Sequence, residues 1–214
     1  MDRSRTARKN YLKYKDMTIQ NVKLQIQASI DVKTTLLTDV DLMEQVVELA
    51  EKCTMALRAG GKVIFCGNGG SFADAQHLSA EFTSRFLFDR PGLASLALGT
   101  NSSAMTAIGN DYGYENVFAR EIQAIATPDD VIIAITTSGN SGNILKALEA
   151  AKEANVSAVV LTGSGRGMLD DATVTLNVPS TDTARIQECH ILLGHIICGF
   201  VEESIFGSLR AKNV

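Results

Sequence analysis

Short apolar runs rich in β-branched residues alternate along the chain with longer segments in which apolar residues recur every three or four positions. The short runs predict five strands, at Lys62–Cys66, Leu93–Leu98, Val131–Thr136, Ala158–Thr162 and Thr173–Val178. The segments between them predict helices over 71–86, 102–108, 114–126 and 141–154. Strands that are apolar throughout and separated by helices are typical of a parallel sheet covered by helices. The pattern therefore predicts an α/β fold with a five-stranded parallel sheet.

Two helical patterns lie outside this alternation. An amphipathic pattern from Met17 to about Leu37 predicts an extra N-terminal helix, and Asp39 or Asp41 can cap a second helix that runs to about Ala59. A last long helix is expected over about 184–207, where apolar side chains cover more than one face. A helix of this kind must be buried on several sides, and one sheet covers only one of them. We therefore expect the last helix and the N-terminal helix to contact other subunits.

Composition fits one compact domain. The 214 residues are 45% hydrophobic, and 20 basic against 24 acidic residues give a net charge of −4, which offers no positive field for nucleic acid. Residues 1–16 differ, because six basic residues face two acidic ones there. We expect a basic, disordered leader at 1–16 and a single domain over 17–214.

The four cysteines predict no disulfide framework or zinc ribbon. Cys53, Cys66, Cys189 and Cys198 form no C-x-x-C pair and lie in apolar segments, as buried thiols do. No uninterrupted apolar run approaches the roughly 20 residues that span a bilayer, and no signal-peptide pattern is present. We expect a cytoplasmic protein that binds neither membranes nor nucleic acid.

A glycine-rich loop, Gly67-Asn68-Gly69-Gly70-Ser71, follows the first predicted strand and precedes a helix. Its glycines allow close backbone approach, and its amides at a helix N-terminus can hold an anion or a sugar oxygen. It is neither a P-loop nor a dinucleotide fingerprint, because Phe72 occupies the third glycine position of the latter. A simple chain reversal remains the alternative.

A second loop, Thr136-Thr137-Ser138-Gly139-Asn140-Ser141, carries four hydroxyl groups in six residues between a strand and a helix. Hydroxyls and free amides at a helix N-terminus suit a phosphate monoester. A helix cap with a turn would account for one or two of these hydroxyls but not for four. Together the two loops indicate a phosphorylated polyol as ligand.

The chain has three histidines, His77, His190 and His195. His77 and Glu81 are spaced i,i+4 on the helix after the glycine loop, which suits a metal-ligand pair and equally suits a surface contact. His190 and His195 lie in the apolar last helix, where a histidine is more often a core residue than a ligand. Their roles stay open at this level.

Six separated features together resemble the phosphoheptose (sedoheptulose-7-phosphate) isomerases, single-domain members of the sugar isomerase (SIS) superfamily. They are Cys66–Ser71, the pair His77 and Glu81, Gly109-Asn110-Asp111, Thr137–Ser141, Arg185-Ile186-Gln187-Glu188, and His195. The resemblance runs from about Ile19 to Phe206. It implies a flavodoxin-like three-layer sandwich, a homotetramer, and conversion of sedoheptulose 7-phosphate to D-glycero-D-manno-heptose 7-phosphate for lipopolysaccharide or other surface heptose pathways.

The resemblance also implies the residues of the site. It gives Glu81 and His195 as catalytic residues, and one zinc ion per subunit on His77, Glu81, Gln187 and His195. It gives as substrate contacts Asn68, Gly69, Gly70, Ser71, Glu81, Asn110, Asp111, Thr136, Thr137, Ser138, Ser141 and Gln187. This chain departs from some members at Thr136, where they have serine, and at Ala184, where they have aspartate.

The chemistry of these residue types agrees with an enediol mechanism. Glu81 is the candidate base for a C1 proton, and His195 is the candidate group that moves a proton between O1 and O2. A carboxylate that ligates zinc is a weaker base, so Glu81 cannot be fully both. Gln187 and His195 are eight residues apart, about 12 Å along a helix, so the two share one ion only if they reach towards each other or if subunits share the site.

The main alternative is a non-catalytic SIS protein similar to the replication-initiator-associating protein, which keeps the fold and binds a protein partner. Such binders lack the pair Glu81 and His195, which this chain retains. A sugar-phosphate sensor would carry a fused DNA-binding domain, for which 214 residues leave no room. The enzyme is the favoured hypothesis.

Overall fold

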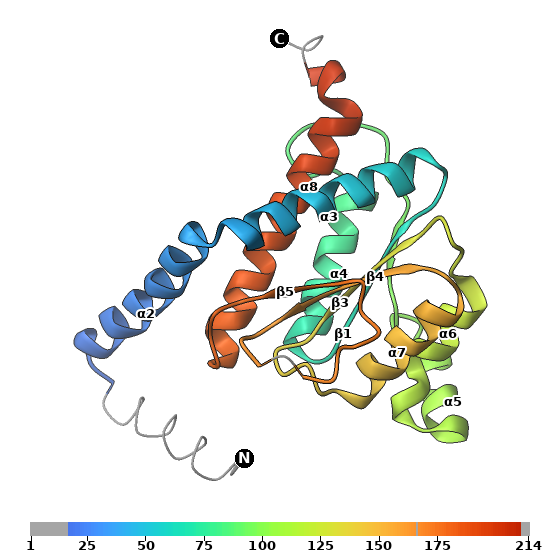
Figure 1. The fold of residues 1–214 in the computed structure, drawn as a ribbon, viewed down its shortest axis with the longest axis horizontal. Helices are drawn as coiled ribbons and strands as arrows, with labels where there is room; N and C mark the ends of the chain where they lie inside the picture. Colours follow the sequence, from blue (N-terminus) through green and yellow to red (C-terminus); the bar gives the residue numbers. More distant parts are fainter. Residues whose placement is uncertain (1–16, 166, 211–214) are drawn as a thin grey trace.

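The computed structural model describes residues 17–165 and 167–210, and the predicted leader at 1–16 lies outside these ranges. Its centre is a parallel sheet (Figure 1), whose strands are paired in the order β2-β1-β3-β4-β5. The strands are β1 (Val63–Gly67), β2 (Ser95–Ala97), β3 (Val131–Ile135), β4 (Ser157–Thr162) and β5 (Val174–Asn177). The five predicted strands and the parallel sheet are therefore confirmed.

The central strands are buried on both faces, which is why their sequences are apolar without alternation. Every residue of β1 and β3 is buried. Val63 and Phe65 belong to one hydrophobic core, whereas Ile64 and Cys66 belong to another on the opposite face. The sheet is thus the middle layer of three.

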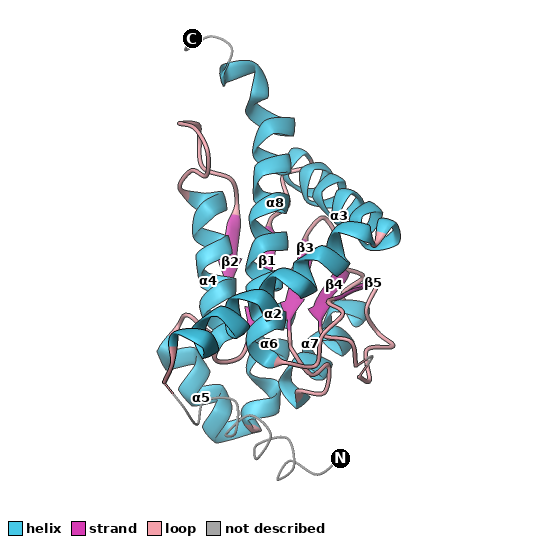
Figure 2. Cartoon of the chain, turned by 90° about the vertical axis from the view of Figure 1, so that its left-hand side faces the viewer, coloured by secondary structure: helices cyan, strands magenta, loops and turns pink. Residues whose placement is uncertain are grey.

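The outer layers are helical (Figure 2). The core on one face contains residues of α3 (Val40–Arg58), α4 (Gly70–Thr83) and α8 (Thr183–Arg210). The core on the other face contains residues of α6 (Val117–Ile125) and α7 (Gly142–Glu153), and α5 (Ser102–Tyr112) packs at its edge. A short 3₁₀ helix, η1 (Tyr114–Asn116), joins α5 to α6. The three-layer α/β sandwich expected from the sequence is confirmed.

Helix α4 ends earlier than predicted. The apolar pattern continues to residue 86, but the helix ends at Thr83. The guanidinium group of the buried Arg90 donates to the carbonyl oxygens of Glu81, Phe82 and Ser84 and so binds the carbonyls that the helix end leaves free. The residues from Ser84 to Gly92 consequently form a loop.

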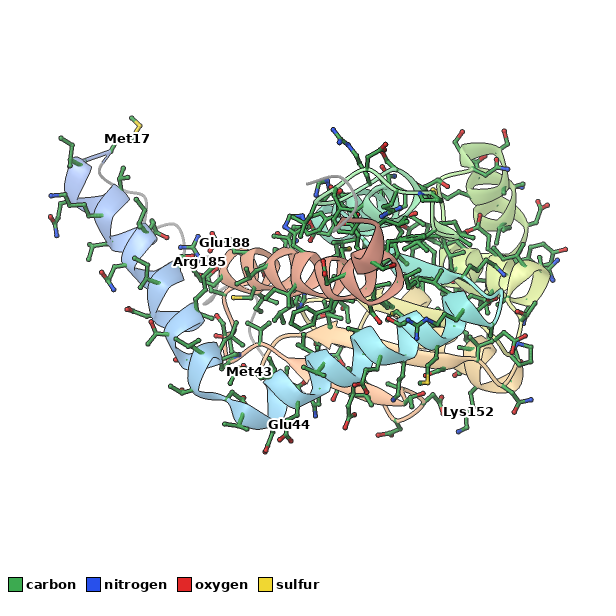
Figure 3. The ribbon with its side chains drawn as sticks, turned by 90° about the horizontal axis from the view of Figure 1, so that it is seen from above. Met17, Met43, Glu44, Lys152, Arg185 and Glu188 are labelled. Atoms are coloured by element: carbon green, nitrogen blue, oxygen red, sulfur yellow. The ribbon has the colours of Figure 1, made fainter. Side chains whose placement is uncertain are left out.

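Helix α2 (Ile19–Thr38) projects from the body of the molecule (Figure 1). Thr18 caps its start, and Asp39 caps the start of α3, as predicted. Leu36 is its single buried residue, whereas its Ile19, Val22 and Ile26 are more than half exposed. Where α2 meets α8, Arg185 donates to the carbonyl oxygen of Gln25, and Glu188 accepts from Ser29 (Figure 3).

Helix α8 has a buried face and an exposed apolar face. Leu193, Ile197 and Val201 are buried against the sheet, whereas Leu192, Ile196 and Phe200 are 37%, 36% and 49% exposed. Within the described residues, one stretch, Thr183–Leu209, is long and apolar enough to cross a membrane by length and composition. The buried face explains this property, because a core helix has the same composition.

Candidate active site

The glycine loop has the strand-to-helix geometry that the sequence predicts. A side chain on Gly67 would bring its Cβ within 2.5 Å of the Ser71 carbonyl oxygen, and Gly69 has a positive φ of 58°. Gly70 begins α4, and the amides of the next three residues, 71–73, donate to the carbonyl oxygens of Asn68 and Gly69. Ser71 is buried at the base of the loop. The amides of Gly69 and Gly70 make no such bond within the described residues, so they can bind an oxygen or an anion.

Helices α4 and α8 lie side by side from this loop onward (Figure 2). A Cβ on Gly194 would lie 2.5 Å from a methyl carbon of Leu78, so glycine is needed for the close approach. At the loop end, a Cβ on Gly70 would lie 2.5 Å from the amide nitrogen of Gln187. Gln187 thus lines the glycine loop, and its contact with substrate stays a prediction.

Two turns further along the same pair of helices, three predicted site residues converge. The Nε2 atom of His77 lies 2.9 Å from Nε2 of His195 and 3.3 Å from Oε1 of Glu81. Ligand atoms of all three residues lie within 4.8 Å of one another. His77 is exposed, and Glu81 and His195 are partly buried. The i,i+4 pair on α4 and the histidine on α8 therefore form one cluster at the surface.

The donor set of this cluster fits a divalent metal. Two imidazoles and one carboxylate are ligands that zinc prefers, and two ligand atoms of a tetrahedral zinc ion lie roughly 3.3 Å apart. The separations of 2.9 and 3.3 Å between His77 and its two neighbours are close to that value. The group can hold a metal with small side-chain movements, and an exposed face leaves room for a further ligand. The role of Gln187 as a fourth ligand stays a prediction.

Asp74 adds a carboxylate that the sequence analysis missed. It lies one turn before His77 on α4, and its Oδ2 is buried without a hydrogen-bond partner among the described residues. Burial raises the pKa of the Asp74 carboxyl, and the nearby His77 and His195 oppose this shift. Its i,i+3 spacing from His77 was the feature of the sequence that could have indicated its place on the same helix face.

The hydroxyl loop follows β3, directly beside the glycine loop, because Gly67 of β1 is paired with Ile135 of β3. Thr136 is buried, and its Oγ1 accepts from the amide of Gly139 at 3.3 Å, while Ser138 Oγ accepts from the amide of Asn140 at 3.2 Å. Ser141 precedes α7 without capping it. Two of the four hydroxyls thus shape the turn, whereas those of Thr137 and Ser141 make no hydrogen bond within the described residues.

Two residues that the sequence analysis did not single out connect the loops. The amides of Asn68 and the buried Asn143 exchange two hydrogen bonds of 2.8 Å, and the hydroxyl of Tyr114 donates to Asn68 Oδ1 at 3.2 Å. Asn68 is therefore oriented from two sides. The position of Asn143 in the first turn after the hydroxyl loop was the available signal.

Asn110 and Asp111 lie apart from the three-residue cluster. Both are exposed at the end of α5, a helix without buried residues, and Asn110 donates to Asp111 at 2.7 Å. The following segment reaches the glycine loop through Tyr114. Their substrate contacts stay a prediction.

The structure separates the two histidines of α8. His195 belongs to the cluster, whereas His190 is fully buried and neither ring nitrogen has a side-chain or backbone partner of good geometry among the described residues. Burial lowers the pKa of His190 from 6.5 to about 4. His190 is therefore a neutral core residue. Arg185 and Glu188, which flank Gln187 in the sequence motif, form an ion pair that contacts α2.

Comparisons with known proteins agree with this architecture. The family model of the SIS domain matches residues 30–163. The chain is 53% identical to a phosphoheptose isomerase of Aneurinibacillus thermoaerophilus over 186 residues, which are 86% of this chain and 94% of that protein. It is similar to the solved phosphoheptose isomerase of Francisella tularensis, with 35% identity, a TM-score of 0.82, and coverage of 87% of this chain and 100% of the other. The corresponding structure from Neisseria gonorrhoeae has 44% identity, a TM-score of 0.78, and coverage of 86% and 99%. The chain belongs to the SIS domain family and, within it, to the phosphoheptose isomerases.

Proposed function

We propose that this protein is an isomerase that converts sedoheptulose 7-phosphate to D-glycero-D-manno-heptose 7-phosphate. The observation that carries the proposal is the convergence of Glu81, His77 and His195 on α4 and α8, two turns beyond the glycine loop. These residues supply a base and a second proton-transfer group at one place. Chains named phosphoheptose isomerase, about half identical in sequence, support the same activity.

The conversion needs two proton movements and no oxidant or reductant. Glu81 removes a proton from C1 of the ketose, which leaves an enediolate, and the protonated Glu81 then returns a proton to C2 to give the aldose. His195 moves a proton from O1 to O2, so that the carbonyl group passes from C2 to C1. Both side chains must therefore face the same two carbons, as their convergence allows.

The phosphate group binds, in this proposal, at the hydroxyl loop. Thr137, Ser138 and Ser141 offer hydroxyls there, and the first two amides of α7 donate to no backbone oxygen within the described residues. Asn68 and the glycine amides then face the sugar oxygens between the phosphate and the reacting carbons. In this proposal the sugar runs from the hydroxyl loop past the glycine loop and along α4, with its reacting end near His77.

We propose that His77, Glu81 and His195 bind zinc, with Gln187 as a further ligand from the family resemblance. Zinc held by these residues would polarise the carbonyl oxygen or orient the two oxygens. Metal analysis of the purified protein tests this directly. We expect about one zinc per chain, its loss in His77→Ala, and its retention in His190→Ala; equal zinc content in all three proteins would contradict it.

We propose a homotetramer in the cytoplasm. The exposed apolar residues of α2 and of α8 provide surfaces for other subunits. All four cysteines are free and buried, as in a reducing compartment. The non-catalytic SIS binder is not favoured, because Glu81 and His195 are both present and both belong to the cluster.

The test is incubation of the purified protein with sedoheptulose 7-phosphate and detection of the aldose by NMR. Dephosphorylated sedoheptulose is the matched control substrate. We expect aldose from the phosphorylated sugar, and much slower conversion of the other. Absence of aldose with the folded, zinc-loaded protein would contradict the proposal.

A further inference from the structure

The loop between α4 and β2 places an aromatic ring on His195. The ring of Phe86 is stacked on the imidazole of His195, with centroids 5.4 Å apart and planes inclined by 26°. The imidazole also contacts the ring of His77 edge-on, at 5.1 Å and 66°. A ring plane in contact with two aromatic neighbours has little freedom to turn, and the direction of Nε2 depends on that plane.

A buried carboxylate holds the backbone of Phe86. Glu202, on α8, is fully buried, and its two oxygens accept from the amides of Phe86 at 2.8 Å and Leu87 at 2.7 Å. Oε1 also accepts from Nε of Arg90 at 2.9 Å, and both side chains are 1% exposed. The carboxylate thus fixes the loop to the same helix that carries His195.

The guanidinium of Arg90 connects the Glu202 carboxylate and the Phe86 loop to the backbone of Glu81. Its Nη2 donates to the carbonyl oxygen of Glu81 at 2.7 Å, and its Nη1 donates to the carbonyl of Ser84 at 3.0 Å. One buried ion pair therefore connects the backbone at Glu81, the loop that carries Phe86, and α8. Desolvation of two charges is costly, so a buried pair is weak support for stability but can fix a unique geometry.

Helix α8 leaves room for the ring. Gly199 lies one turn after His195, and a Cβ there would meet the Phe86 ring at 3.5 Å. A methyl group fits at that distance, whereas a longer side chain would have to displace the ring. The neighbouring Leu87 is 63% exposed, whereas Phe86 is partly buried against the hydrophobic core.

We propose that Phe86 is a positioning residue for His195, and that the buried pair Arg90–Glu202 holds its ring in place. The stack keeps the imidazole turned so that Nε2 faces Glu81 and His77. The inference rests on the proposed function, in which His195 moves the proton between the substrate oxygens. Loss of the ring is expected to reduce turnover more than substrate binding, because the ring packs on the proton-transfer group His195.

The test uses protein labelled with ¹³C at Cε1 of histidine. The chain has three histidines, so three signals are expected, and His195→Gln identifies the one of interest. An aromatic ring stacked on an imidazole shifts its proton signals to higher field. Phe86→Leu should move the His195 signal to lower field and lower kcat roughly 10- to 100-fold with KM nearly unchanged, whereas Phe86→Tyr should retain both the wild-type signal and kcat.

Two controls separate positioning from general packing. Phe88→Leu makes the same change in the same loop at a side chain that is also partly buried, and should leave the His195 signal and kcat unchanged. Gly199→Leu should reproduce the effect of Phe86→Leu with Phe86 still present, and Gly199→Ala should not. An unchanged His195 signal in Phe86→Leu, or equal effects of Phe86→Leu and Phe88→Leu, would overturn the inference. If the wild type lacked isomerase activity, the proposed function would fail while the NMR signal still tested the stack.

Discussion

The Nε2 atoms of His77 and His195 lie 2.9 Å apart, although the two residues are separated by 118 positions in the chain. The close packing of α4 on α8 at Gly194 creates this contact. Glu81 joins it through its spacing of four residues from His77. The two candidate proton-transfer groups therefore depend on one helix–helix interface.

His195→Gln should reduce turnover by at least 100-fold, because proton transfer by a placed side chain contributes roughly that much or more. The double variant with Glu81→Gln should lose little more than the more impaired single variant, since both groups act in one proton-transfer sequence. Steady-state kinetics on all three proteins measures this. Additive losses would indicate independent roles, and near wild-type turnover in His195→Gln would remove His195 from the mechanism.

Ser141→Ala should weaken binding of the phosphorylated substrate by roughly 10- to 100-fold, the range for loss of a hydrogen bond to a charged group. The Ser141 side chain makes no capping hydrogen bond, so the stability of the Ser141→Ala protein should equal that of the wild type. Ser138→Ala should lower both affinity and stability, because Ser138 Oγ accepts from Asn140. Isothermal titration and thermal unfolding compare the two. Wild-type affinity in both variants would show that this loop does not bind the phosphate.

His190 should make the protein less stable as the pH falls below about 6.5. Its pKa of about 4 in the folded chain is lower than its ordinary 6.5, so the unfolded chain binds more protons between these values. Stability therefore rises with pH through this window, and between about pH 5 and 7.5 the contribution of one such group is about 2 kcal/mol. Urea unfolding of wild type and His190→Leu at both pH values isolates it. An equal pH dependence in the two proteins would contradict the prediction.

Substitution of an exposed apolar residue by glutamate should disrupt assembly without unfolding the chain. Ile26 on α2 is 56% exposed and Leu192 on α8 is 37% exposed. Light scattering should report about four protomers for wild type and fewer for Ile26→Glu and Leu192→Glu. Gln20→Glu, a polar exposed position on α2, is the control and should remain tetrameric. A wild-type protein that is fully active as a monomer would contradict the proposed assembly.

The sheet and most helix positions could be predicted because they depend on local patterns. Strands buried on both faces are apolar at every position, as in β1 and β3, and Asp39 is a strong cap at the start of α3. The pattern failed at the end of α4, where the apolar residues continue but Arg90 binds the helix carbonyls. Arg90 and its partner Glu202 are 112 residues apart, a separation that no local pattern can bridge.

The site was also predictable where it depends on a local pattern. The spacing of His77 and Glu81 indicated a shared helix face, and the structure confirms it. The roles of His190 and His195 could not be separated, because α8 is apolar on more than one face and periodicity does not say which face meets the sheet. Packing decides this, and it also decides that Leu193 is buried while the adjacent Leu192 is exposed.

The most direct test of the proposed activity compares wild type with Glu81→Gln on sedoheptulose 7-phosphate, with the aldose followed by NMR and with equal amounts of folded protein. The proposed mechanism predicts aldose with wild type, the same equilibrium mixture when the reaction starts from the aldose, and at least a 100-fold slower reaction with the variant. Aldose formation by Glu81→Gln at the wild-type rate, or no aldose with wild type, would contradict it.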